Sequence, residues 1–103
     1  MNQTIERTAL THLVTNEEFA RKVLPHIKSD YFSDRTERTI FEEIEKFVDK
    51  YKKIPTQTSL EIEVQSRKDL NEDDYKKVAE VIRTLKETEV DFEWLVNTTE
   101  QFC

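Results

Sequence analysis

The chain of 103 residues contains no glycine. Phosphate-binding loops and dinucleotide-binding turns need glycine, because a residue without a Cβ lets the backbone approach the anion closely. Tight hairpin turns also depend on residues that tolerate positive φ, and Asn-Gly and Asp-Gly pairs are absent. The missing glycine therefore excludes a P-loop and a dinucleotide fold and disfavours a hairpin-rich β architecture. It also predicts that helices end through Asn, Pro or fraying.

Cysteine and long apolar runs are also scarce. The one cysteine, Cys103, leaves no internal disulfide, as expected for a reducing cytosol. No apolar run approaches the ~20 residues that cross a bilayer, and the N-terminus has no signal-peptide core. We therefore expect a soluble intracellular chain without membrane contact.

Positive charge is in deficit. The 16 Lys and Arg residues against 22 Asp and Glu residues give a net charge of −6, which opposes strong binding to a nucleic-acid backbone. Acid and base alternate at helical i,i+4 spacing, which is typical of a solvated helix face. The pairs are Glu17-Arg21, Glu18-Lys22, Glu42-Lys46 and Asp49-Lys53.

Apolar residues at spacings of three and four predict an all-α fold, a single compact bundle of about six helices. Six Phe, three Tyr and one Trp supply the anchors of its core. The expected helices are about 3–14, a second one capped by Asn16 and broken near Val23 or Leu24 by Pro25, a long central one after Asp34, 59–66, one started by residues 71–74, and a last one opened by Asp91.

The long central helix carries the strongest pattern. Its apolar face is formed by Ile40, Phe41, Ile44, Phe47, Val48 and Tyr51. Asp34 can cap its start, with Glu37 three residues on, and Thr58 to Glu61 reads as a capping box for the next helix. Tyr51 lies in the basic run 50–53 and can stack on a nucleic-acid base, but its spacing favours closure of the apolar stripe.

Residues suited to catalysis or metal binding are few. His12 and His26 lie in different segments with no third ligand at a fixed spacing. The acidic run 71–74 lacks the glycine of a calcium loop and is explained by a helix dipole. Glu42 and Glu43 are adjacent and diverge on a helix, so they need a third element to converge. We therefore predict no catalytic, cofactor or metal site in this chain.

Four stretches resemble the amino-terminal domain of DnaB-type replicative DNA helicases, in the branch of T-even-like phages. They read FARKVLPHIKSDYF (19–32), TIFEEIEKFVDKYKKIPTQTSLEIEV (39–64), DYKKVAEVIRTL (74–85) and DFEWLVNTTEQF (91–102). The most specific parts are the step from Tyr31-Phe32 to Ile40-Phe41, the Lys-Ile-Pro boundary and the Trp94-Leu95-Val96 triplet. The broader DnaB pattern has His-Arg where this chain has Glu37-Arg38.

The resemblance implies that residues 1–103 are the helical amino-terminal collar domain of a longer helicase, without catalytic residues. A carboxy-terminal RecA-like domain would bind ATP and magnesium and drive 5′-to-3′ movement on single-stranded DNA. The implied partners are copies of the chain, paired within a hexamer, primase and a helicase loader. The implied location is the cytoplasm of the infected bacterial host, where the protein would serve DNA replication.

The last predicted helix has apolar residues on more than one face, so all of them cannot enter one core. We therefore expect a partner or self-association site at Phe92, Trp94, Val96 and Phe102, although Trp94 can also be the central aromatic of the bundle. This helix has no stop signal, which favours continuation into a connecting region.

Two other classes of function stay open. One is a free-standing acidic helical adaptor or regulator that binds a host protein. The other is a small enzyme or nucleotide-handling bundle that uses clustered carboxylates such as Glu43 together with His26.

Overall fold

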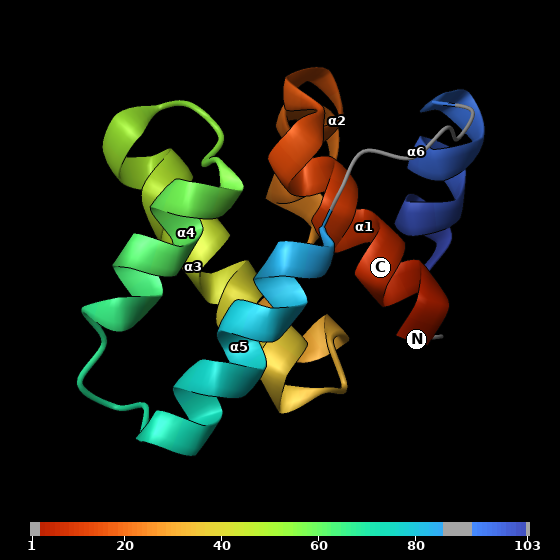
Figure 1. Cartoon of the computed structure of the whole chain (residues 1–103). Helices are drawn as coiled ribbons and strands as arrows, with labels where there is room; N and C mark the ends of the chain where they lie inside the picture. The colour runs from red at the N-terminus through yellow and green to blue at the C-terminus, as the bar shows by residue number, and fades with distance from the viewer. Residues whose placement is uncertain (1–2, 86–91, 103) are drawn as a thin grey trace.

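The computed structural model describes residues 3–85 and 92–102, and in these ranges the chain forms helices and no strand. The predicted all-α bundle with one long central helix is confirmed (Figure 1). The elements are α1 (Gln3–Thr15), α2 (Glu17–Val23), η1 (Leu24–His26), η2 (Ser29–Tyr31), α3 (Arg35–Tyr51), α4 (Gln57–Gln65), α5 (Glu72–Thr84) and α6 (Phe92–Phe102). None of the described helices is both long and apolar enough to cross a membrane.

Side-chain caps start the helices where the sequence predicts them, with one exception. The Asn16, Asp34 and Asn71 side chains accept hydrogen bonds from the backbone N–H three residues on, at 2.8–3.0 Å. The predicted box at Thr58 is wrong, because Thr56 caps α4 and Ser59 closes the box. The Ser59 hydroxyl accepts from the Thr56 N–H at 2.8 Å and so replaces the Glu or Gln expected at this position. The helix α4 starts at Gln57, two residues before the predicted start. The cap of α6 at Asp91 lies outside the described residues.

Two helix ends show how the chain turns without glycine. The helix α2 ends at Val23, and η1 follows with Pro25 in its first turn, as predicted. The end of α3 differs from the prediction, because Lys52 takes the left-handed conformation at φ 60° and ψ 29°. Its N–H donates to the Val48 carbonyl oxygen at 2.8 Å, so a lysine performs the role that glycine usually has.

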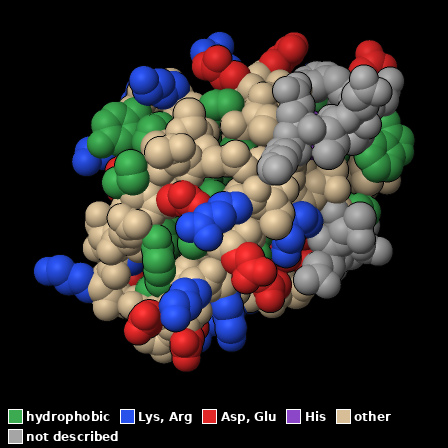
Figure 2. Space-filling view, in the orientation of Figure 1, with side chains coloured by type: hydrophobic (Ala, Val, Ile, Leu, Met, Phe, Trp, Pro, Cys, Tyr) green, Lys and Arg blue, Asp and Glu red, His purple; other side chains and the backbone are tan. Residues whose placement is uncertain are grey.

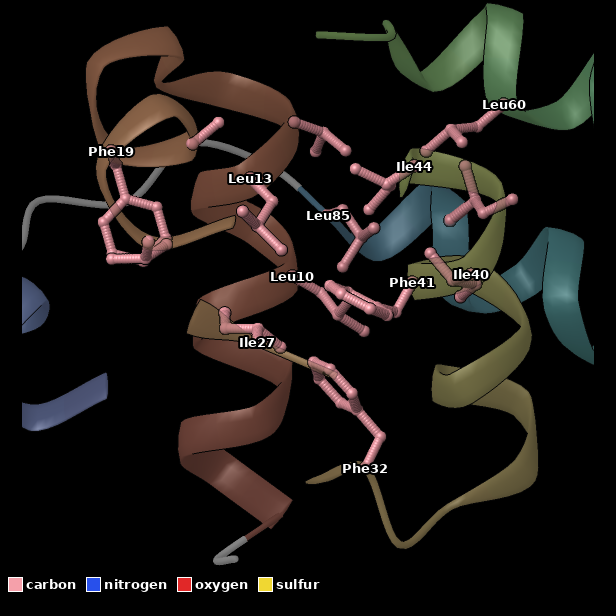
Figure 3. Close-up of a cluster of buried hydrophobic side chains, with 14 of the residues drawn as sticks. Leu10, Leu13, Phe19, Ile27, Phe32, Ile40, Phe41, Ile44, Leu60 and Leu85 are labelled. Carbon is pink, nitrogen blue, oxygen red and sulfur yellow. The ribbon is translucent and has the colours of Figure 1, made fainter. Parts of the chain in front are cut away.

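Each of the described α-helices contributes to one hydrophobic core. Figure 3 shows the part of this core around Leu10, Phe41 and Leu60. The helix α3 packs against α1, α4 and α5, and α6 packs against α1 and α2. The Phe32 and Phe41 rings stack with their centroids 5.1 Å apart. One fully buried residue from each helix is Leu10, Phe19, Phe41, Leu60, Ile82 and Leu95.

The apolar stripe of α3 is buried at its N-terminal end and emerges at its C-terminal end. Ile40, Phe41 and Ile44 are fully buried, whereas Val48 is half-buried. Tyr51 packs on the Phe47 ring with the centroids 4.6 Å apart, so it closes the stripe as predicted, although its side chain is 45% exposed. The core elements therefore cover the first half of α3 more completely than the second.

Candidate partner-contact site

The residues predicted for self-association do not share one environment. Trp94 is 53% exposed, so it is not the central aromatic of the bundle; Phe19, Phe32 and Phe41 have that place. Val96 is 4% exposed and belongs to the core, so its inclusion in a surface site is a correction to the prediction. Helical spacing explains the difference, because residues two apart point to different sides of a helix. The Phe92 and Phe102 side chains lie outside the described residues. A role of Phe92, Trp94 and Phe102 in self-association stays a prediction.

A second apolar feature is a groove between the α2–η1 segment and the C-terminal half of α3. It encloses about 390 Å³, and its apolar lining consists of Ala20, Leu24, Pro25, Val48 and Ile54. Because α2 ends at Val23, the apolar residues near the end of α3 are incompletely covered. Sequence reasoning missed this groove, although the Pro25 break and the long α3 were both predicted.

Charged side chains surround the groove. Glu17 and Arg21 form an ion pair at 2.8 Å, the one predicted i,i+4 pair that the described residues show. Glu45 and Asp49 lie one turn apart on α3, and Lys52 and Lys53 follow them. Partial burial, Asp49 and Glu42 all raise the pKa of Glu45 above its ordinary value. The groove therefore has an acidic stretch followed by a basic end.

Elsewhere the surface mixes both signs of charge. Figure 2 shows Lys and Arg side chains interspersed with Asp and Glu, and with small hydrophobic groups, on the face in view. Ile62 on α4 is another apolar residue at the surface, 56% exposed.

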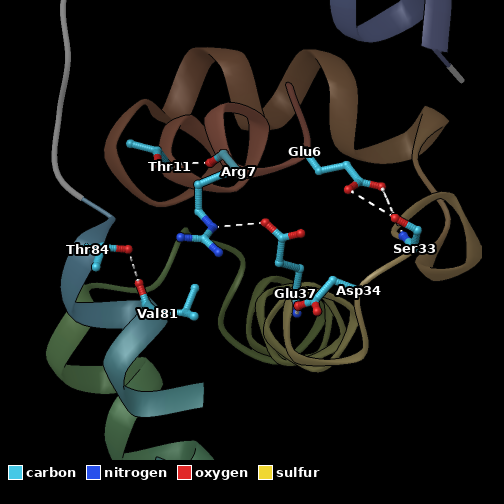
Figure 4. A network of polar contacts seen from close by, with 8 residues as sticks. All are labelled: Glu6, Arg7, Thr11, Ser33, Asp34, Glu37, Val81 and Thr84. Carbon is cyan, nitrogen blue, oxygen red and sulfur yellow. Dashed lines mark hydrogen bonds and ion pairs between the residues drawn. The ribbon is translucent and has the colours of Figure 1, made fainter. Parts of the chain in front are cut away.

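Two carboxylates that the sequence pattern assigns to no core position are completely buried (Figure 4). Glu6 accepts hydrogen bonds from the Ser33 N–H at 2.9 Å and from the Ser33 hydroxyl at 3.2 Å. Glu37 accepts from Arg7 Nε at 2.9 Å, and burial outweighs this contact and raises the Glu37 pKa. These contacts join α1 to the start of α3, so their role is structural.

A third buried carboxylate, Glu43, lies 3.2 Å from an Arg67 guanidinium nitrogen. Glu42 approaches the same nitrogen at 3.7 Å, so Arg67 is the third element on which the two carboxylates converge. Arg67 also pairs with Asp69 at 2.6 Å and lowers the pKa of this exposed carboxyl to about 2. The clustered carboxylates thus anchor the segment after α4 to α3.

The two histidines lie in different environments. His12 is buried, with Nδ1 3.0 Å from the Thr8 carbonyl oxygen and its ring against Phe19, whereas His26 is exposed. Among the described residues, no group of three His, Cys, Asp or Glu side chains could hold a metal ion. In the acidic run 71–74, Asn71 caps α5, and Asp74 lies 3.6 Å from Arg35.

Comparison with known families identifies the class of protein. The family described as DnaB-like helicase N terminal domain matches residues 1–94. The chain therefore belongs to this family, and the resemblance seen in the sequence is confirmed.

A curated relative gives a more particular comparison. The chain is 28% identical over 93 residues to the DnaB-like replicative helicase of Enterobacteria phage T4. The match covers 90% of this chain and 19% of that helicase. The chain thus spans about a fifth of the length of the curated relative.

Proposed function

We propose that this chain is the non-catalytic assembly and partner-contact domain of a phage replicative DNA helicase. In this role it holds copies of itself together in a hexameric ring and links the ring to primase. A carboxy-terminal ATPase domain would use ATP and magnesium for 5′-to-3′ unwinding. The family match over residues 1–94 is the observation that carries the proposal.

The roles of the buried carboxylates and the apolar residues at the surface support a contact role for the chain itself. The buried carboxylates Glu6, Glu37 and Glu43 have Ser33, Arg7 and Arg67 as neighbours, so they serve packing. The apolar residues left at the surface include Trp94 on α6 and the lining of the groove. Such apolar surfaces are typical of protein contacts. The net charge of −6 would leave DNA to another part of the helicase.

The test is a chimera in which residues 1–94 replace the aligned region of the phage T4 relative. Mass photometry would measure ring assembly, and primer synthesis would be measured with the primase from the same source as this chain. We expect hexamers and a primer yield above that of a helicase from which the aligned region is deleted.

A chimera that folds but does not assemble, under conditions in which the unaltered helicase forms hexamers, would contradict the proposal. That result would favour the acidic adaptor that binds a host protein. An assembled chimera without a gain in primer synthesis would retain the assembly role and reject the primase contact.

A further inference from the structure

The groove between the α2–η1 segment and α3 has the form of a binding site. Its volume of about 390 Å³ falls within the range of about 300–1,000 Å³ found for ligand pockets. Leu24, Val48 and Ile54 pack against the core, and each of these side chains is half-buried. The groove is therefore an apolar hollow whose lining residues are packed against the hydrophobic core.

The charges along one wall have a definite order. Glu45 and Asp49 are separated by one helical turn, roughly 6 Å, and Lys52 and Lys53 come at the end of the helix. In the described residues, no ion pair within 4.0 Å involves any of these four side chains, whereas Glu17 has Arg21 at 2.8 Å. Like charges at i,i+4 are unfavourable, and a ligand cation would relieve this repulsion.

We propose that the groove binds an amphipathic helix of a partner protein. Apolar side chains of that helix would fill the hollow, and a Lys or Arg would lie beside Glu45 and Asp49. An acidic side chain one turn away would lie beside Lys52 and Lys53. This inference specifies the contact role proposed above and rests on it for the partner being a replication protein.

Charge complementarity favours this occupant over two others. Nucleic-acid phosphates would be repelled by Glu45 and Asp49, which lie between the basic end and the rest of the groove. Residues 92–102 of a second copy contain Glu93 and Glu100 but no Lys or Arg, so they offer no cation to the acidic stretch. A helix with both charges matches the whole wall.

The experiment uses a fluorescein-labelled synthetic peptide of about four helical turns, with a leucine stripe flanked by an Arg and, one turn later, a Glu. Fluorescence anisotropy with the 103-residue chain gives the dissociation constant, and ¹⁵N chemical shifts locate the peptide. We expect shifts at Val48 and Ile54, and binding about tenfold weaker in the double variant E45K/D49K.

A matched variant separates a site from general attraction of a cationic peptide to an acidic protein. E18K/E80K makes the same change in net charge at exposed residues outside the groove, and we expect less than about a threefold effect. Both variants change exposed side chains, and circular dichroism checks that they fold.

Three results would overturn the inference. They are equal weakening by the two variants, shifts outside the groove, and no binding up to about 1 mM peptide. Displacement of the peptide by a single-stranded oligothymidylate would assign the groove to nucleic acid instead. If the chimera assembles but the peptide fails these tests, the inference falls and the proposed assembly role stands.

Discussion

At the scale of single residues, Glu37 is a carboxylate that the fold buries completely. Glu37 lies three residues after Asp34, where a capping box would direct its side chain back to the cap. Its carboxylate instead faces Arg7 on α1, and one of its oxygens has no hydrogen-bond partner among the described residues. An incompletely paired, buried carboxylate is costly to ionise, which explains its raised pKa.

The substitution Glu37→Gln tests this balance through pH. Because the pKa of Glu37 is raised above 4.5, the folded chain binds a proton there at pH values where the unfolded chain does not. Stability from this group therefore increases as pH falls from neutral towards 4.5 and is lost as pH rises through the raised pKa. We expect the wild type to gain stability relative to E37Q on acidification, as measured by urea unfolding at several pH values.

The control is Glu18→Gln, which removes one carboxylate from an exposed position on α2. It reports the effect of changing the net charge alone. A constant difference between the wild type and E37Q over this pH range would show that burial does not govern Glu37.

At the scale of helices and turns, most boundaries follow from local chemistry. The caps at Asn16 and Asp34, the start of α5 within residues 71–74 and the break at Pro25 are all predicted, because each depends on residues within one turn. The end of α3 could not be predicted in this way. Lysine has no preference for positive φ, so the residue type at position 52 does not indicate its left-handed conformation.

Lys52→Gly is expected to stabilise the protein by roughly 0.5–1 kcal/mol, because glycine adopts φ 60° without a steric cost. Lys53→Gly is the matched control, since Lys52 alone has positive φ among the described non-glycine residues. We expect this control to lose about 0.5–1 kcal/mol through the greater entropy of the unfolded chain. Urea unfolding measures both, and equal losses would contradict the strain assigned to Lys52.

At the scale of the whole molecule, the distribution of apolar residues separates the core from surfaces available to partners. Trp94 and Ile62 are both more than half exposed, on α6 and α4. Their helices lie in different parts of the bundle (Figure 1). This separation allows a contact at one of them to be tested against the other.

Trp94→Ala is expected to weaken self-association by about 2 kcal/mol if Trp94 anchors the contact between copies. The same substitution should lower the free energy of unfolding by about 1 kcal/mol, because the Trp94 side chain is 53% exposed. Sedimentation velocity and thermal melting measure the two effects. Ile62→Ala controls for the loss of an exposed apolar side chain, and unchanged sedimentation of W94A would make Trp94 a passive surface residue.

The sequence by itself determined the helical class, most helix starts, the break at Pro25 and the family. Caps and 3.6-residue periodicity are local, so they can be recognised before any helix is packed. Only the tertiary structure decided that Glu6, Glu37 and Glu43 are buried, that Val96 is inside while Trp94 is exposed, and that a groove lies beside α3. These features depend on which helix faces meet and on where one helix ends relative to another, and no local pattern contains that information.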